Sequence, residues 1–308
     1  MRLARTCTLV ALLCSLSAAT WYAGDFERLG TSARSLGMGG AAVTTSLGPA
    51  AIYYNPARAG LPGRAGLVFM HSEDFSGLVK HNYLAAAFPS ERQSVGVAVL
   101  HNGIPGIRLT ALPDSTRPPG PDNRPYTVRV VSANQLVGYV NYARTIIPEL
   151  SVGGNAKVIY QDLGVGNCFG MGIDIGLLVR PGAGVDVGLR ARNASAAPLF
   201  WSTGTRELVL PRFALGAGRT FGLGSDALTL AIEAEGGIEE PGLAYNLGAE
   251  YAFRNVLFGR AGLHEGNLTF GLGLRYRRLH IDYAYASGYA AGSRELGSAQ
   301  QVSGGVEF

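Results

Sequence analysis

The sequence is poor in charge and in cysteine, and it has no apolar run long enough for a transmembrane helix. Only 16% of the 308 residues are charged and 47% are hydrophobic. This composition argues against a disordered chain, because disorder requires low hydrophobicity and high net charge. No stretch after Ala19 keeps about 18 consecutive apolar residues, so spanning helices are excluded. With only 3 cysteines, a disulfide-built secreted domain is excluded as well.

The features of nucleic-acid binders and of common enzymes are also missing. The lysines are Lys80 and Lys157 alone, and the arginines are scattered among acidic residues instead of forming a basic stripe. The chain contains no G-x-S-x-G, G-x-G-x-x-G or H-E-x-x-H motif. We therefore expect no enzymatic activity, no cofactor, no metal site and no nucleic-acid partner.

The first 19 residues have the pattern of a secretory signal peptide. Arg2 and Arg5 precede an apolar run from Leu9 to Leu16, and the small residues Ser17-Ala18-Ala19 follow. We predict cleavage of residues 1–19. The mature chain then keeps Cys168 as its only thiol.

Glycine is abundant, and apolar residues alternate with small ones. The chain has 44 glycines, about twice the average usage. From Phe169 onwards every second residue is large and apolar, and the residues between are mostly glycine: Phe169, Met171, Ile173 and Ile175 against Gly170, Gly172, Asp174 and Gly176. A period of two is typical of a strand with one apolar face.

Fourteen segments of this kind follow one another. They lie near 63–73, 77–88, 93–103, 127–145, 150–162, 167–180, 184–194, 207–220, 225–237, 242–253, 255–264, 267–276, 279–288 and 299–308. Pro211 moves the expected start of the eighth strand towards Phe213. Transmembrane strands need about 9 to 11 residues, and bacterial barrels have an even number of strands. We predict an all-β, transmembrane antiparallel β-barrel of about 14 strands over residues 63–308.

Loop lengths support this prediction independently of hydrophobicity. The long connections 104–126, 195–206 and 289–298 all fall on one side of the sheet, and the other side has only short turns. Outer-membrane barrels show this asymmetry, with the long loops outside the cell. Phe200 and Trp201 in one long connection are candidates for an apolar landing site. His71, His81 and His101 lie near the outer ends of the first three strands, where we expect imidazoles at the membrane interface with no shared face.

The face opposite the apolar one contains the candidate functional side chains. Both signs of charge occur there, so these residues can form ion pairs between strands and plug or hydrogen-bond a solute. The lumen candidates on the strands are Asn155, Lys157, Asp174, Asp186, Arg190, Arg192, Glu233, Glu235, Glu250, Arg275 and Asp282.

Residues 20–62 do not alternate and are rich in glycine and small residues. A barrel of fourteen strands is too wide for its own side chains to fill, since about eight strands already enclose a packed interior. We therefore predict that residues 20–62 form a hatch in the lumen, with Arg34, Asn55 and Pro56 as further candidates.

Two motifs in this segment resemble a known family. The run Ser32-Ala33-Arg34 through Gly39-Gly40-Ala41, followed by Asn55-Pro56-Ala57, is similar to the N-terminal signature of the PorV/PorQ-type outer-membrane proteins of the FadL-like barrel superfamily. Gly154-Asn155-Ala156-Lys157 resembles a second recurring element of that group. The resemblance implies a fourteen-stranded barrel with an N-terminal hatch, and a role in carrying hydrophobic compounds or in type IX protein secretion. Ser46-Leu47-Gly48 departs from the acidic pair that relatives often have.

The C-terminal residue Phe308 ends an alternating strand, as in the signal that the outer-membrane assembly machinery recognises. The sequence thus predicts an outer-membrane barrel. Its expected partners are outer-membrane lipid, the assembly machinery and either a hydrophobic small molecule or secretion-system proteins. A structural, surface-anchoring barrel without transport is one alternative, and an outer-membrane hydrolase that uses His71, His81 and His101 is the other.

Overall fold

The computed structural model describes residues 24–61, 63–75, 77–238, 242–288 and 298–308. The predicted signal peptide 1–19 and nearly all of the predicted connection 289–298 lie outside the described residues. None of the described helices combines the length and the hydrophobicity needed to cross a bilayer.

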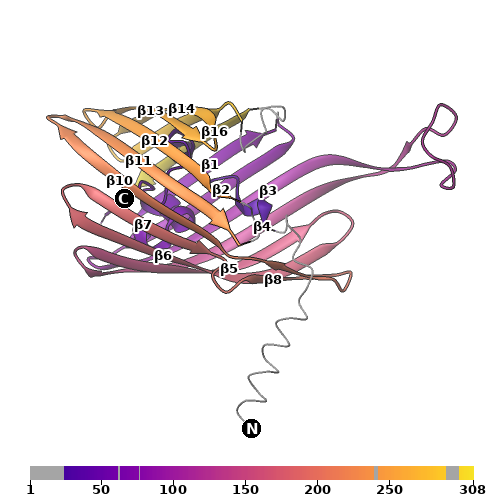
Figure 1. Ribbon diagram of the computed structural model, residues 1–308, viewed down its shortest axis with the longest axis horizontal. Coiled ribbons are helices and arrows are strands. Elements are labelled where there is room, and N and C mark those ends of the chain that lie inside the picture. The colour runs from indigo at the N-terminus through magenta and orange to yellow at the C-terminus, as the bar shows by residue number, and fades with distance from the viewer. Residues whose placement is uncertain (1–23, 62, 76, 239–241, 289–297) are drawn as a thin grey trace, which may run out of the picture.

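Antiparallel strands form one closed ring (Figure 1). The strands of the described part are β1 (Gly66–Asp74), β2 (Val79–Pro89), β3 (Gln93–Ala111), β4 (Tyr126–Ile147), β5 (Leu150–Asp162), β6 (Asn167–Gly182), β7 (Val185–Arg192), β8 (Ala197–Trp201), β9 (Arg206–Val209), β10 (Arg212–Leu223), β11 (Asp226–Gly237), β12 (Ala244–Phe253), β13 (Leu257–His264), β14 (Asn267–Tyr276), β15 (Leu279–Ala286) and β16 (Ala299–Glu307). Each of β1 to β6 pairs with the next strand, β7 pairs with β10, the order continues to β16, and β16 pairs with β1. The predicted barrel of fourteen strands is confirmed.

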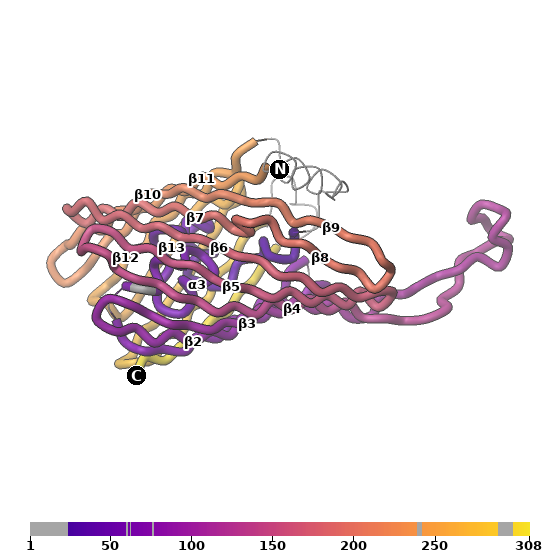
Figure 2. Tube along the Cα trace, turned by 90° about the horizontal axis from the view of Figure 1, so that it is seen from below, coloured from indigo at the N-terminus to yellow at the C-terminus, as the bar shows by residue number. Residues whose placement is uncertain are grey.

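Two connections differ from the prediction. The segment 195–206, expected to be a loop, contains β8, which pairs with β6 at Cys168–Gly170 and forms a hairpin with β9. Connection 104–126 is shorter than expected because β3 continues to Ala111 and β4 begins at Tyr126. Residues 104–133 form a two-stranded ribbon that projects from the ring, which we call the arm (Figures 1 and 2). We call this end of the barrel the arm end and the opposite one the turn end.

The outer face of the ring is apolar, as the alternation predicts. Phe169, Met171, Ile173 and Ile175 on β6 are exposed, and the residues between them are buried. Leu268, Phe270, Leu272 and Leu274 on β14 are exposed in the same way. In water such a surface would be a large exposed apolar patch, whereas lipid tails cover it in a transmembrane barrel.

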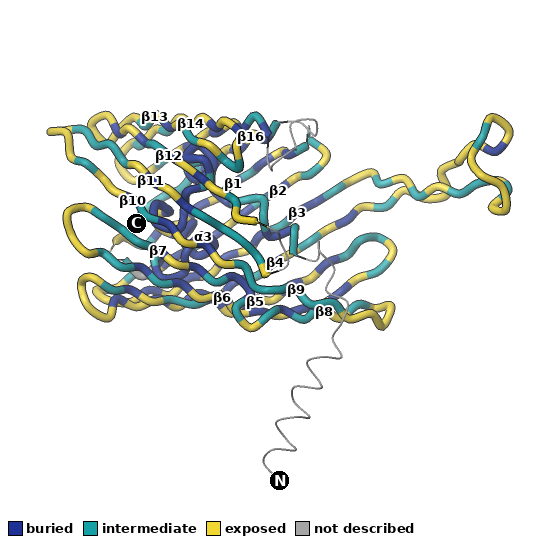
Figure 3. Tube along the Cα trace, in the orientation of Figure 1, coloured by how far each residue is buried: buried dark blue, intermediate teal, exposed yellow. Residues whose placement is uncertain are grey.

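Residues 24–61 lie inside the ring as a chain of short helical turns (Figures 2 and 3). They contain η1 (Asp25–Glu27), α2 (Ala33–Gly37), η2 (Gly48–Ala50), α3 (Ala51–Tyr54) and η3 (Pro56–Gly60). Most of their described side chains are buried. We call residues 24–61 the inner segment.

The two sides of the lumen are lined differently. On β1 to β6, large apolar side chains such as Met70, Tyr83 and Leu100 pack against α3 in one core. On β11 to β16 the buried apolar side chains that pack against the inner segment are small, among them Ala231, Ala284 and Ala299. The inner segment is therefore packed as in a protein core on one side only.

The histidines correct one expectation. His71 and His101 do share a face, the outer one, where Asn82 bridges them: His71 Nδ1 lies 2.8 Å from Asn82 Oδ1, and Asn82 Nδ2 lies 3.4 Å from His101 Nδ1. Their strands pair His71 with Asn82 and Asn82 with His101, which places all three in one row. His81 points inwards, is fully buried and contacts Asn102 and the carbonyl oxygen of Gly30.

Candidate functional site

At two places a pair of wall glycines lets the backbone of the inner segment approach the strands closely, and we call each of these glycine pairs a seat. The first lies under the Asn55-Pro56-Ala57 motif, where Gly153 of β5 and Gly176 of β6 pair with each other. A Cβ at Gly176 would lie 2.3 Å from Asn55 Oδ1, and one at Gly153 would lie 2.5 Å from the Pro56 oxygen. Only glycine leaves room for this approach.

Asn55 itself is a local organiser. Its side-chain oxygen accepts a hydrogen bond from the Ala57 amide at 3.1 Å and so caps η3. Its amide nitrogen donates to the carbonyl oxygens of Val43 at 2.9 Å and Leu177 at 3.1 Å. One fully buried side chain thus ties two parts of the inner segment to β6.

The second seat lies on the opposite side, under the Gly39-Gly40 turn. Gly248 of β12 pairs with Gly262 of β13, and a Cβ on either would lie 2.3 to 2.4 Å from the Met38 oxygen or the Gly39 nitrogen. Gly39 and Gly40 have φ values of +64° and +79°, which favour glycine. The Gly39 amide donates to Thr269 Oγ1 at 3.1 Å.

A dry charge cluster lies beside the first seat. Lys157 Nζ is 2.6 Å from Glu27 Oε1 and 3.0 Å from Asp174 Oδ1, and the three side chains are at most 4% exposed. Asp174 also accepts hydrogen bonds from the Asn193 amide and from Asn155 Nδ2. Removing one partner from such a cluster leaves a buried charge without compensation, so this contact fixes η1 strongly.

An ionic network lies beside the second seat. Arg34 of α2 donates two hydrogen bonds to Glu250 of β12, at 2.7 and 2.8 Å. Arg260 of β13 donates to the same carboxylate at 2.6 Å and to Asp282 of β15 at 2.7 Å. Arg34 is 14% exposed, so this network is wetter than the Lys157 cluster.

Three further contacts tie the inner segment to β7 and β11. Glu233 Oε2 accepts hydrogen bonds from the amides of Ala42 and Val43 at 2.7 and 2.8 Å. Arg190 donates to the Tyr54 oxygen at 3.2 Å and to Glu235 at 2.7 Å. Near the turn end, Arg58 forms a 2.6 Å ion pair with Asp186.

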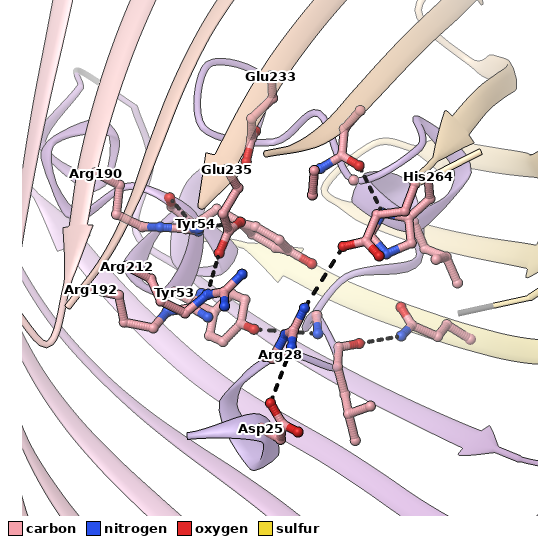
Figure 4. A pocket seen from close by; sticks show the side chains of 18 of the residues that line it. Asp25, Arg28, Tyr53, Tyr54, Arg190, Arg192, Arg212, Glu233, Glu235 and His264 are labelled. Carbon is pink, nitrogen blue, oxygen red and sulfur yellow. Dashed lines mark hydrogen bonds and ion pairs between the residues drawn. The ribbon is translucent and has the colours of Figure 1, made fainter. Parts of the chain in front are cut away.

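A cavity of about 190 Å³ opens towards the arm end (Figure 4). Tyr53 and Tyr54 of α3 line it together with Arg190, Arg192 and Arg212 from β7 and β10, and His264 of β13 lies opposite. The Arg192 guanidinium stacks 4.3 Å from the centre of the Tyr53 ring. Burial raises the pKa of Tyr54 to about 12, so its hydroxyl stays neutral and accepts a hydrogen bond from the Thr31 amide.

Two cavities lie towards the turn end, on the other side of α2. One of about 250 Å³ is lined by Arg34, Glu250, Phe258 and Asp282 among others, and one of about 200 Å³ by Thr44, Arg58 and Asp186. Leu36 of α2 lines the arm-end cavity, whereas Arg34 and Ser35 line the larger turn-end cavity. One short helix thus separates the two spaces.

All the residues singled out inside the barrel from the sequence face its interior, but they do not form one site. Asn155, Lys157 and Asp174 belong to the dry cluster; Arg34, Glu250 and Asp282 to the ionic network; Arg190, Arg192, Glu233 and Glu235 to the arm-end side; Asn55 and Pro56 to the first seat; and Asp186 pairs with Arg58. Arg275 lines the larger turn-end cavity beside the ionic network and donates to Asn255 Oδ1 at 3.3 Å.

Other expectations fall outside the lumen. Phe308 is 61% exposed, and its amide donates to the Ala65 oxygen at the turn end. Phe200 is exposed on β8, whereas Trp201 packs against the buried core, so the two rings do not form one landing site.

Sequence reasoning missed Glu27, Arg58 and Arg260. Arg260 alternates with outward residues on β13, so the period-two pattern holds the signal that finds it. Glu27 and Arg58 lie in the inner segment, where no period marks the buried positions.

Comparison with known proteins is informative for structure alone. No family model matches the sequence, and no curated protein is similar to it in sequence. The fold is similar to the Ralstonia pickettii toluene transporter TbuX, with 14% identity over 92% of this chain and 100% of that chain and a TM-score of 0.59. For the CymD monoaromatic hydrocarbon channel the identity is 14% over 91% of this chain and 98% of that chain, and the TM-score is 0.59. For a Pseudomonas aeruginosa FadL homologue the identity is 11% over 90% of this chain and 98% of that chain, and the TM-score is 0.54. The chain therefore has the fold of the FadL-like barrels.

Proposed function

We propose that this chain is an outer-membrane barrel of the PorV/PorQ type that passes small hydrophobic solutes through its lumen, past α2. One observation carries the proposal: α2 lies between a cavity open towards the arm end and a larger one towards the turn end. The arm end, where the longest connections gather, faces outwards from the cell in this arrangement. The signal peptide 1–19 delivers the chain, and Phe308 serves its assembly.

The size and lining of the cavities support a small, ring-shaped solute. A cavity of about 150 Å³ in another protein binds benzene, and the arm-end cavity has about 190 Å³. Tyr53, Tyr54 and Phe75 supply aromatic surface there. The structural neighbours named as a toluene transporter and a monoaromatic hydrocarbon channel agree with this class of solute and with a protein that is not an enzyme.

The glycine seats and ion pairs support a role for the inner segment as a hatch. Both family-like motifs are used in docking: Gly39-Gly40 on one seat and Asn55-Pro56-Ala57 on the other. The second seat and the Arg34 network border cavities, whereas the first seat adjoins the dry cluster. Movement of α2 away from Glu250 joins the two spaces without disturbing the first seat.

Uptake of ¹⁴C-labelled toluene by cells that produce the chain tests the proposal. Leu36→Trp fills the arm-end cavity from α2 and is expected to lower uptake to the level of cells without the chain. Lys80→Trp, on the outer face of β2, is the matched control and should leave uptake unchanged. A surface-anchoring barrel predicts equal uptake for the wild type, both variants and cells without the chain, and that result would overturn the proposal.

Planar-bilayer conductance tests the hatch separately. Arg34→Ala removes two hydrogen bonds between α2 and Glu250, and deletion of residues 24–61 removes the inner segment. Conductance is expected to be lowest for the wild type, intermittent for Arg34→Ala and largest for the deletion. Equal conductance for the wild type and the deletion contradicts a hatch.

An accessory role in type IX protein secretion is the second candidate. It rests on the likeness of residues 30–62 to the PorV/PorQ signature. The genome that encodes this chain must then also encode type IX secretion components, and their absence removes this candidate.

A further inference from the structure

The arm is a ribbon whose two outer edges have no neighbouring strand. The last wall pair of β3 with β2 is Lys80 with Gly103, and the first pair of β4 with β5 is Asn134 with Asp162. Beyond these pairs β3 and β4 form strand pairs only with each other among the described residues. Figures 1 and 2 show the ribbon standing away from the rest of the ring. Free strand edges carry backbone groups that can pair with another chain.

The two edges are protected to different degrees. The β3 edge contains Pro105 and Gly106, the latter with a φ of +74°, and a bulge between Ile104 and Ile107. Prolines and bulges are the usual means of blocking an edge. The β4 edge has neither proline nor positive φ between residues 126 and 133, but it has a bulge at Val128, so it is blocked less completely than the β3 edge.

The less protected β4 edge also presents apolar side chains. Tyr126, Val128 and Val130 are 54%, 61% and 59% exposed. Near the base, Gly164 lies close to Val131, and Arg129 donates to the Gly164 oxygen at 3.0 Å. The free part of the edge is therefore the segment 126–130.

Arginine outnumbers acid on the arm. Arg108, Arg117, Arg124 and Arg129 are exposed, and the acidic residues are Asp114 and Asp122. Asp114 is engaged locally, because the Thr116 hydroxyl and amide both donate to its carboxylate. The charge of the arm therefore favours an acidic partner.

The tip of the arm is held in one conformation by hydrogen bonds of a buried side chain. Asn123 is 2% exposed, and its amide nitrogen donates to the carbonyl oxygens of Asp114, Arg117 and Pro118 at 2.9 to 3.2 Å. Its side-chain oxygen accepts a hydrogen bond from the Asp114 amide at 3.0 Å. Five prolines, at 113, 118, 119, 121 and 125, restrict the same connection. A preorganised element loses little conformational entropy on binding.

We propose that the arm is a docking element for a protein: an extended segment of another protein, apolar at alternate positions and acidic at its ends, adds a strand to the β4 edge at 126–130. Strand addition obtains affinity from backbone hydrogen bonds and specificity from alternate side chains. Val128 and Val130 supply the apolar contacts, and Arg124 and Arg129 face the acidic ends. The proposal requires only that the arm is accessible, so it stands apart from solute passage.

A synthetic peptide of alternating valine and threonine with two glutamates at each end tests it. Fluorescence anisotropy measures its binding to the purified full-length barrel in detergent. In the arm-shortened variant an Asn-Gly turn replaces residues 105–132 between the paired Ile104 and Ala133, a connection that suits a two-residue hairpin. We expect binding to weaken about tenfold or more in this variant and in Arg124→Glu with Arg129→Glu. Arg206→Glu, an exposed arginine on β9, is the control and should bind as the wild type does.

Three results would overturn the proposal. The first is that the peptide binds the wild type and the arm-shortened variant equally well, or that a peptide with lysines in place of the glutamates binds the wild type as well as the glutamate peptide does. The second is wild-type dimerisation in sedimentation that the shortening abolishes, which makes the arm a self-association element. The third is arm-dependent binding to lipopolysaccharide vesicles without peptide binding. Toluene uptake by the arm-shortened variant should equal that of the wild type, so failure here leaves solute passage untouched.

Discussion

The two sides of the barrel hold the inner segment by different physics. On β1 to β6, α3 packs into an apolar core, and the Lys157 cluster beside it is dry. On β12 to β15, α2 is held by the Gly248–Gly262 seat and by Arg34 and Arg260, whose carboxylate partners line a cavity. Packing and dry charges make a permanent anchor, whereas ion pairs beside water can exchange partners at low cost. If α2 moves as proposed, this difference makes the β1–β6 side of the inner segment the fixed one and the β12–β15 side the movable one.

Lys157→Met tests the fixed side and should have the largest effect. It removes the cation that lies within 3.0 Å of both Glu27 and Asp174 in a buried site, which costs about 3 to 5 kcal/mol of stability. The temperature at which the folded barrel loses its characteristic gel mobility measures the loss. The other lysine provides the control: Lys80 is exposed on β2, and Lys80→Met should change stability by less than about 0.5 kcal/mol. Similar losses of stability in Lys157→Met and Lys80→Met would contradict a role of the Lys157 cluster as a dry anchor.

Gly262→Ala tests the seat on the movable side, with an intermediate effect. The added Cβ would lie 2.4 Å from the Gly39 nitrogen, so the turn must lift, at a cost of about 1 to 3 kcal/mol. Bilayer conductance should rise because α2, which lies directly before this turn in the chain, moves with it. Gly259→Ala on the same strand meets nothing within 4 Å and should conduct as the wild type does. Unchanged conductance in Gly262→Ala would show that the Gly248–Gly262 seat does not fix the position of α2.

Arg58→Gln should have the smallest effect. Its ion pair with Asp186 borders a cavity near the turn end, and the two side chains are 11% and 24% exposed. A partly solvated pair of this kind contributes about 1 kcal/mol or less. Thermal unfolding in 0.1 and 1 M salt checks this, because the difference between variant and wild type should shrink in high salt. A loss as large as that of Lys157→Met would mean that exposure does not rank these contacts.

The wall of the barrel could be predicted from the sequence because alternation is a local property. Each strand shows its lipid face in its own residues, so the predicted β5 (150–162) and β14 (267–276) agree with the observed bounds. The β8–β9 hairpin was missed because its strands are only five and four residues long and one contains Pro198. Short segments carry too few periods to stand out from a loop.

The inner contacts depend on relations between strands that no local pattern encodes. The glycines of β6 alternate visibly with large apolar residues, but that Gly153 of β5 meets Gly176 depends on strand register. The buried position of Glu27 depends on Lys157, 130 residues away along the chain. Polar inward residues were therefore identifiable one by one, while their grouping into a dry cluster and an ionic network was not.

The glycine seats also constrain how the molecule is made. The inner segment precedes β1, touches strands from both halves of the ring, and lies inside a circle that only the β1–β16 pairing closes. Backbone contacts this close leave no route for threading the segment through a finished cylinder. When the inner segment is present, the wall therefore curls around residues 24–61 during biogenesis, and the segment reaches its place before the cylinder closes.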